Sequence, residues 1–364
     1  MATIFLNSHR AKSGLLNGQR LPDAYVLAAK FFDCGIIDRT HSLDVGFEQK
    51  VLNEIPTYDP NFKLSFSEIT YERARLIWQE ADERELDVQL LWSGGIDSTV
   101  ALIALEQMAT PQQKNRLRIL LSMDSINEYP LFFRRFILHR LNFQFIRPPV
   151  TSHIADDCLI VTGEHGDQLF GSDKLLPLIE NGLALEKWEL ILPIFLHNKL
   201  GNAKKADQLV DYLQPLIAAA PQPIVSTFDL FWWLNLTIKW QQVSLRLPVF
   251  SFQENVRELS GRYRHYFRYD DYQQWALGRG EERAVERLSD YKLPAKHFIY
   301  AYTKDNTYLQ QKSKEPSLKN VILNRQKQGQ KRYRIHMDES YAPKVEVFHR
   351  QFKNKSMASL EPES

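Results

Sequence analysis

Short apolar runs alternate with longer amphipathic segments through the middle of the chain. The apolar runs predict buried strands at residues 88–92, 117–123, 143–146 and 158–162, and the segments between them have helical spacing. Strands that alternate with helices are typical of a parallel sheet covered by helices. The pattern therefore predicts an α/β fold with a doubly wound, mostly parallel sheet.

Helical patterns surround this region. They predict helices at 67–85 and from Thr99 onward, an amphipathic helix at roughly 130–141, and a mainly helical half from Leu175 to about Asp290. The aromatic residues between Phe228 and Trp240 have the spacing of a helix core, which we favour over a cofactor pocket. Residues 1–85 form a small N-terminal module without a catalytic constellation, and we expect it to serve packing or oligomer contacts.

Bulk composition excludes several classes. The 364 residues carry a net charge of +2, so no overall attraction to nucleic acid or to a membrane is implied. Cys34 and Cys158 are too few for a disulfide framework or a cysteine-based zinc site. The first residues do not form a signal peptide, and no apolar run reaches membrane-spanning length. The expected location is the cytoplasm.

The string S-G-G-I-D-S joins the first predicted strand to a helix and has the properties of an anion-binding loop. Gly94 and Gly95 let the backbone approach an anion, and the helix points free N–H groups into the loop. Ser93 and Ser98 add hydroxyl donors. Asp97 is compatible with a phosphate only when a cation lies beside it. The loop therefore predicts a site for pyrophosphate and Mg²⁺.

A second glycine-rich string, V-T-G-E-H-G-D-Q-L-F-G-S-D, follows the fourth predicted strand. It brings Glu164 and Asp167 close to the expected position of Asp97, where mutual repulsion calls for a cation or a proton. We expect Asp97 and Asp167 to be magnesium ligands, which leaves Glu164 as the candidate general base. A solvated surface turn is the alternative interpretation of this string.

Ligands of parallel sheets bind at the carboxyl ends of strands. Met123, at the end of the second predicted strand, is therefore expected beside the loop, where adenine and ribose would bind. Leu91 and Gly163, at the ends of the first and fourth strands, complete the expected nucleotide-binding set.

The two strings together resemble a known family. The first resembles the pyrophosphate loop of the N-type ATP pyrophosphatases. The second resembles the S-G-E-G-S-D-E-[LV]-F-G-G segment of the synthetase domain of asparagine synthetases and of the related β-lactam synthetases, carbapenam synthetases and lasso-peptide cyclases. The resemblance covers about 86–317 and implies an adenine nucleotide α-hydrolase-like fold over 86–320.

The second string departs from that pattern at three positions. His165 stands where the family has glycine, Gln168 where it has glutamate, and Asp173 near the usual tyrosine. These differences concern the identity of the substrate more than nucleotide binding.

Two later segments extend the resemblance. S-L-R-L-P-V-F-S, with Arg246 and Pro248, resembles the family string E-x-R-x-P-F-L-D, and Asp229 lies near the position of an acidic residue that lines the family's active site. K-H-F-I-Y, which begins at Lys296, resembles the family's K-x-x-L-R helix start.

K-S-K-E-P-S resembles the family's R-x-K-E-x-F-S loop. This match implies that Lys314 is the catalytic lysine, which neutralises charge on the α-phosphate and on the departing pyrophosphate, and that Lys296 assists. Lys304 is the alternative to Lys314.

The resemblance implies an ATP-dependent, AMP-forming amide ligase. A carboxylate would attack the α-phosphate to give an acyl-adenylate, and an amine, deprotonated by Glu164, would then attack the acyl carbon. Ala2 stands where glutamine-dependent asparagine synthetases have a catalytic cysteine, and the segment before the loop is too short for their glutaminase domain. The amine is then free ammonia, one delivered by a separate ammonia-supplying or substrate-carrying protein, a second small molecule, or a group on the substrate itself.

Alternatives remain open. The same loop occurs in enzymes that adenylate a base, such as 7-cyano-7-deazaguanine synthases and tRNA lysidine synthetases. A basic segment from Asn324 to Arg334 would suit a nucleic-acid substrate, but within the polar tail at 321–364 we favour a solvated or partner-ordered segment. Two further alternatives are a nucleotide-binding protein without catalysis and an inactive subunit that needs a glutaminase-like partner.

Overall fold

The computed structural model describes residues 2–147, 153–249, 261–312 and 336–338. Its centre is a five-stranded, all-parallel sheet with the order β6-β5-β4-β7-β8. The strands are β4 (Asp87–Leu91), β5 (Leu117–Leu121), β6 (Asn142–Phe145), β7 (Cys158–Thr162) and β8 (Tyr263–His265). The α/β class and the four predicted strands are confirmed. The short fifth strand, β8, was not predicted, because three residues carry no readable apolar pattern.

Strand β4 lies in the middle of the sheet and pairs with β5 on one side and β7 on the other. The chain moves outward from β4 through β5 to β6, then returns to β7 on the opposite side. This order is compatible with a doubly wound fold, in which ligands bind where the strand order reverses. The loops after β4 and β7 flank that reversal.

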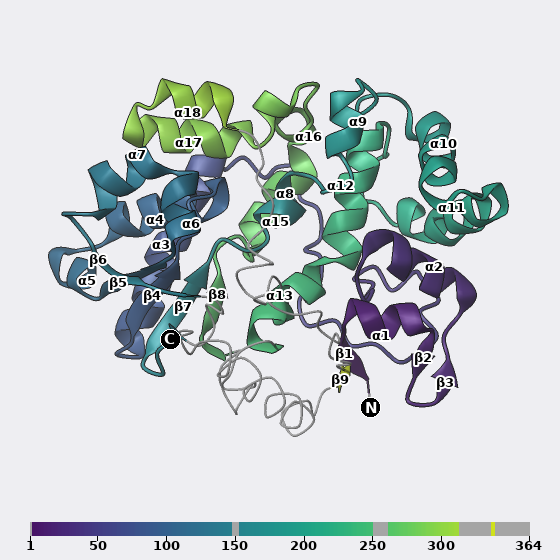
Figure 1. Ribbon diagram of the computed structural model, residues 1–364, viewed down its shortest axis with the longest axis horizontal. Coiled ribbons are helices and arrows are strands. Elements are labelled where there is room, and N and C mark those ends of the chain that lie inside the picture. Colours follow the sequence, from purple (N-terminus) through teal and green to yellow (C-terminus); the bar gives the residue numbers. More distant parts are fainter. Residues whose placement is uncertain (1, 148–152, 250–260, 313–335, 339–364) are drawn as a thin grey trace, which may run out of the picture.

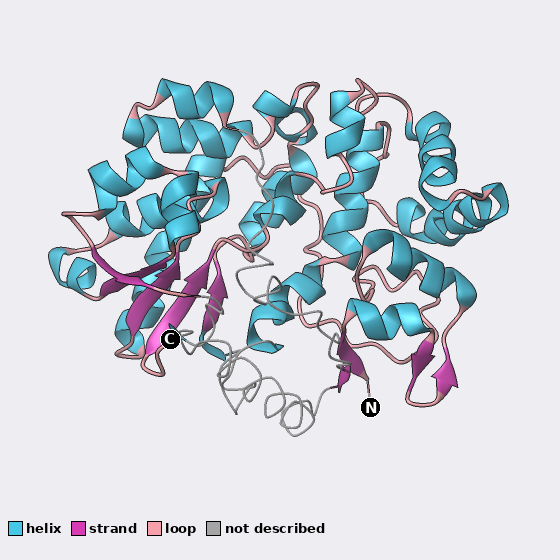
Figure 2. Ribbon diagram, viewed as in Figure 1, coloured by secondary structure: helices cyan, strands magenta, loops and turns pink. Residues whose placement is uncertain are grey.

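Helices cover the sheet, as Figures 1 and 2 show. Helix α3 (Phe66–Glu83) and helix α17 (Leu293–Thr303) both pack against α4 (Ile96–Met108). A capping box between Ser65 and Glu68 begins α3, and Trp78 anchors it to α4 by donating Nε1–H to the Leu105 carbonyl, 2.9 Å away. The helix that follows the loop after β4 is therefore part of a packed core.

The helix expected at 130–141 is wrong in detail. The structure has α6 (Met123–Glu128), the short α7 (Pro130–Phe132) and a π-helical turn, η1 (Phe133–Ile137). The wider π turn, closed by the Leu138 N–H on the Phe133 carbonyl at 2.9 Å, allows both Phe133 and the neighbouring Phe132 to be buried.

The helical half of the chain surrounds helix α12 (Thr227–Ile238), which is apolar along almost its whole length. Its elements are α8 (Gly166–Phe170), α9 (Leu176–Glu180), α10 (Trp188–Leu200), α11 (Ala203–Ala218), α12 (Thr227–Ile238), α13 (Trp240–Val249), α15 (Asp270–Gly278), α16 (Gly280–Arg283), η3 (Leu288–Asp290) and α18 (Asn306–Gln311). Trp233 and Trp240 are fully buried, so the prediction that the aromatic stripe is core is confirmed.

The N-terminal segment lies against this helical half, at the right in Figure 1. It contains β1 (Thr3–Leu6), α1 (Ser8–Ser13), β2 (Leu15–Leu16), β3 (Gln19–Arg20) and α2 (Asp23–Phe32). Helix α2 packs against α11, and β1 pairs in antiparallel fashion with β9 (His336–Asp338). Three residues of the predicted tail at 321–364 therefore complete a two-stranded sheet with the start of the chain.

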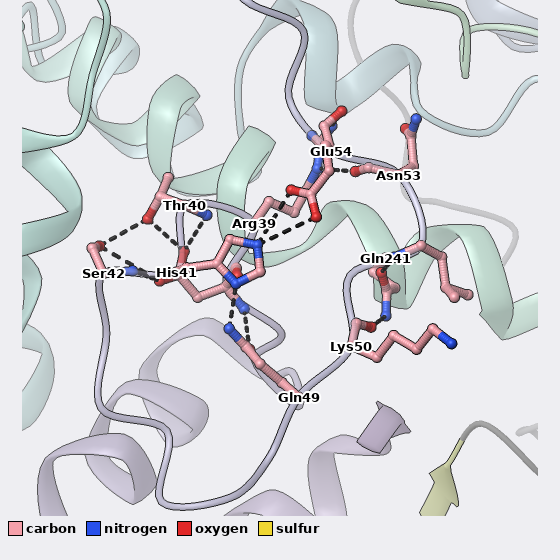
Figure 3. A network of polar contacts seen from close by, with 11 residues as sticks. Arg39, Thr40, His41, Ser42, Gln49, Lys50, Asn53, Glu54 and Gln241 are labelled. Carbon is pink, nitrogen blue, oxygen red and sulfur yellow. Dashed lines mark hydrogen bonds and ion pairs between the residues drawn. The ribbon is translucent and has the colours of Figure 1, made fainter. Parts of the chain in front are cut away.

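A buried arginine joins the N-terminal segment to the helices (Figure 3). Arg39 donates to the carbonyls of Asn53 and Leu236 at 2.8 and 3.0 Å and to Gln273 Oε1 at 2.6 Å, and its guanidinium lies 4.5 Å from the centre of the Trp240 ring. Burial lowers the pKa of Arg39 to about 9. The contacts with Leu236, Gln273 and Trp240 are long-range in sequence, so the network fixes the N-terminal segment against α12, α13 and α15.

Among the described residues, no helix combines the length and apolar character needed to cross a membrane.

Candidate active site

The loop after β4 has the shape expected of an anion site. Gly94 has a φ of +79°, and a Cβ built on it would lie 2.2 Å from the carbonyl oxygen of Ser125. Only glycine fits that conformation and that approach. Gly95 is the N-cap of α4, so the first N–H groups of a 13-residue helix open onto the loop.

The two serines of the loop bond to each other. Their Oγ atoms are 2.9 Å apart, and the Ser93 N–H donates to Ser98 Oγ at 3.0 Å. The start of α6 lies alongside, since Ser125 approaches Gly94. Met123, at the first position of α6, is 59% exposed. The structure thus brings Met123 and the loop to the same edge of the sheet.

Three segments meet at one buried lysine. Lys292 Nζ lies 2.5 Å from Asp97 Oδ2 and 2.8 Å from Asp167 Oδ1, and the side chain is 5% exposed. Asp97 is the second residue of α4, Asp167 is the second residue of α8, and Lys292 is the N-cap of α17. Burial lowers the pKa of Lys292, but attraction to Asp167 and Asp97 outweighs burial and raises it above the usual value.

The sequence predicted that Asp97 and Asp167 lie close together, but it did not predict that Lys292 lies between them. It lies four residues before Lys296, outside the string that resembles the family, and it has no motif of its own. Its one signal is its position immediately before Leu293-Pro294, since proline marks the first turn of a helix.

Asp97 and Asp167 fit a divalent cation. They converge on one ammonium, and a Cβ on Gly166 would lie 2.2–2.4 Å from the Asp97 carboxylate, so only glycine leaves this space open. Magnesium is held by one or two carboxylates, with phosphate oxygens and waters as the other ligands. Among the described residues no group of three or more His, Cys, Asp or Glu side chains could hold a metal, so the protein alone offers no full set of ligands.

Glu164 is largely buried, with 13% of its side chain exposed, and is paired with Arg246, which comes from α13. Burial raises the pKa of Glu164, and Arg246 opposes this effect only in part. Asp167 and Asp97 are close enough to raise it further. The three acids predicted from the sequence therefore share one environment, and Arg246 is part of it.

The structure accounts for His165, one of the departures from the family pattern. Its φ is +74°, a conformation that glycine adopts readily, so the histidine follows a glycine-type path. The ring is buried, lies 4.2 Å from the Trp240 ring, and places Nε2 3.0 Å from Ser244 Oγ. Burial holds the pKa of His165 well below its usual range, so the ring is neutral near pH 7.

The other two departures are structural. Gln168 is buried and donates Nε2–H to Asn235 Oδ1 at 3.4 Å. Asp173 is half exposed and forms an ion pair of 2.9 Å with Lys239.

Two further lysines belong to the helical segments that follow Lys292. Lys296 is buried on α17 and donates to the Ser289 carbonyl at 2.6 Å, and burial lowers its pKa to about 8. Lys312 pairs with Glu128 Oε1 at 3.1 Å, and that oxygen would lie 3.1 Å from a Cβ on Gly95. Lys314 and the basic segment at 324–334 lie outside the described residues.

The other residues predicted from the sequence lie at different distances from the loop. Gly163 lies against α4, since a Cβ there would be 2.6 Å from the Ser98 nitrogen. The side chain of Leu91 is buried among apolar residues, so only its backbone can serve a ligand. Asp229 completes the capping box that Ser226 begins at the start of α12, and its Oδ1 lies 3.5 Å from Arg283 Nη2. Lys304 is exposed at the end of α17.

Comparisons of the chain with protein-family models, with curated proteins and with solved structures gave no match. The class that fold and site define is therefore an α/β protein with a parallel sheet and a glycine-rich anion-type loop at its central strand.

Proposed function

We propose that the protein is an ATP-dependent, AMP-forming amide ligase that adenylates a carboxylate and transfers the acyl group to an amine. One observation carries the proposal. The glycine-rich loop after the central strand and the acidic turn after the neighbouring strand both contact the ammonium of Lys292, through Asp97 and Asp167. An anion loop with two facing acids suits a metal-bound triphosphate better than a bare phosphate.

The loop would hold the triphosphate. The N–H groups at the start of α4 and the hydroxyls of Ser93 and Ser98 would donate to its oxygens. Magnesium, which Asp97 and Asp167 would hold, supplies charge neutralisation on the phosphates. Met123, exposed beside the loop, would contact the adenine end of the nucleotide.

Lysines would stabilise the departing pyrophosphate. Lys296, on α17, is one candidate for this step, and the resemblance adds Lys314. The acyl-adenylate then meets an amine, which must lose a proton before or during attack. Glu164 would serve as the base: it lies on the same turn as Asp167, and its raised pKa brings a carboxylate nearer to the pH at which it exchanges protons with an amine.

Product analysis tests the proposal. The purified protein is incubated with ATP, Mg²⁺ and panels of carboxylic acids and amines, and mass spectrometry scores AMP against ADP and the acyl–amine adduct. AMP, pyrophosphate and an amide that form in equal amounts support the proposal. ADP as the product would contradict the proposal, because ATP would then have been attacked at its γ-phosphorus rather than at its α-phosphorus.

The pH dependence of adenylation tests Lys296. Its pKa of about 8 means that its positive charge is present below pH 8 and is lost above it. Pyrophosphate release should therefore fall as the pH rises through about 8. Lys296→Arg should keep the rate constant to higher pH, because arginine stays charged. Lys204→Arg, on the exposed surface of α11, serves as the control and should leave the decline in place. An identical decline in Lys296→Arg would remove this role.

The base is tested by Glu164→Gln. The variant should still form adenylate and pyrophosphate, while amide formation slows by roughly 10²–10⁴-fold, the usual contribution of a general base. Rapid-quench analysis that separates adenylate from amide is the measurement. Amide formation at the wild-type rate would assign the proton transfer to another group.

A further inference from the structure

Lys292 occupies the point at which the two acidic residues face each other. Its Nζ is within hydrogen-bond distance of both, 2.5 Å from Asp97 and 2.8 Å from Asp167, and its side chain is 5% exposed. Two carboxylates this close repel each other unless a cation lies between them. In this structure the cation belongs to the chain itself.

The backbone at Lys292 is held in a conformation that lysine rarely adopts. Its φ is +61°, in the left-handed region. The residue before it, Tyr291, is buried, and its ring would lie 2.9 Å from a Cβ on Gly171 at the end of the acidic turn. The packing of Tyr291 thus fixes the strained residue beside the turn, and strain of this kind is concentrated at functional sites.

The same two carboxylates would serve a metal ion. Magnesium binds carboxylate oxygens at about 2.0–2.1 Å, so the ion and the ammonium cannot both lie between Asp97 and Asp167. The ammonium is tethered, so its local concentration is high and does not depend on the solution. A free metal ion must compete with it, whereas a metal that arrives on a triphosphate brings further ligands.

We propose that Lys292 is a tethered counter-ion that competes with magnesium for Asp97 and Asp167. It holds the loop after β4 and the turn after β7 together in the resting protein, and it makes metal entry depend on the nucleotide. The inference rests on the metal-ligand role that the proposed function gives to the two aspartates.

Thermal unfolding of the full chain without nucleotide tests the competition. In EDTA, Lys292→Met should lower Tm by on the order of 2–5 °C, because it removes the ammonium that offsets the repulsion between two partly buried carboxylates, which are 21% and 34% exposed. Millimolar Mg²⁺ should restore most of that loss in the variant and leave the wild type unchanged. Lys304→Met is the matched control for Tm, since Lys304 also has a positive φ, +56°, at the other end of α17 and is exposed.

A second variant guards against misfolding. Lys292→Gly removes the charge but relieves the strained φ. Electron paramagnetic resonance with Mn²⁺ as the probe should show that Lys292→Gly binds the metal without nucleotide at least about tenfold more tightly than the wild type does, as expected when a competing ligand is removed. Adding Asp167→Asn to Lys292→Gly should abolish that gain.

Two results would overturn the inference: Lys292 variants that gain no response to Mg²⁺ or Mn²⁺, or a wild type that responds to the free metal as strongly as they do. Failure of the ligase proposal has a separate signature. The wild type would then release no pyrophosphate from MgATP with any acid and amine, whatever the metal titrations give.

Discussion

Replacing Asp97 with asparagine is expected to abolish magnesium-dependent release of pyrophosphate, with a loss on the order of 10³-fold or more. Asp97 lies in the first turn of the helix behind the loop and shares the ammonium of Lys292 with Asp167. Asparagine keeps the shape of the side chain but removes one of the two charges that would bind the metal. The measurement is a coupled pyrophosphate assay at saturating ATP, with Tm recorded in parallel.

Asp156→Asn is the matched control. Asp156 lies just before β7 and is 82% exposed, in a loose ion pair of 3.7 Å with Arg262. Exposed pairs contribute about 0–1 kcal/mol, so this variant should match the wild type in stability and in rate. Pyrophosphate release in Asp97→Asn at more than a tenth of the wild-type rate would contradict the role given to the loop.

Gly94→Ala is expected to destabilise the protein by about 2–4 kcal/mol and to abolish ATP binding. The positive φ alone costs a non-glycine residue roughly 1–2 kcal/mol. In addition, the new Cβ would lie 2.2 Å from the Ser125 carbonyl oxygen, so the loop and the start of α6 must move apart. Urea unfolding and nucleotide titration measure the two effects.

Gly18→Ala isolates the backbone contribution. Gly18 has a φ of +84°, and a Cβ there would meet nothing within 4 Å. Its substitution should cost only about 1–2 kcal/mol, the price of the positive φ, and should leave ATP binding intact. Equal losses of stability at the two glycines would show that the approach of Ser125 to Gly94 is unimportant.

The elements that depend on local pattern could be predicted. Four strands and the loop after β4 follow from apolar runs and from the order of glycine, serine and aspartate, and the proximity of Asp97 and Asp167 follows from strand ends that share one edge of a sheet. The sequence alone therefore located the acidic part of the site.

The remaining parts depend on contacts between distant segments. Lys292 reaches Asp97 across 195 positions of sequence, and Arg39 reaches Leu236 across 197. No periodicity within one segment encodes such a contact. At position 165 the structure shows a buried part of the turn, with a φ of +74° and a bond to Ser244, and neither feature can be read from the sequence.

The most direct test is a crystal structure with magnesium and α,β-methylene-ATP, an analogue that cannot be split between its first two phosphates. The account predicts that the triphosphate lies on Gly94, Gly95 and the first turn of α4, with the metal between it and Asp97 and Asp167, and with Lys292 displaced from at least one of these carboxylates. A loop without nucleotide at saturating analogue, or a triphosphate bound elsewhere, would contradict it.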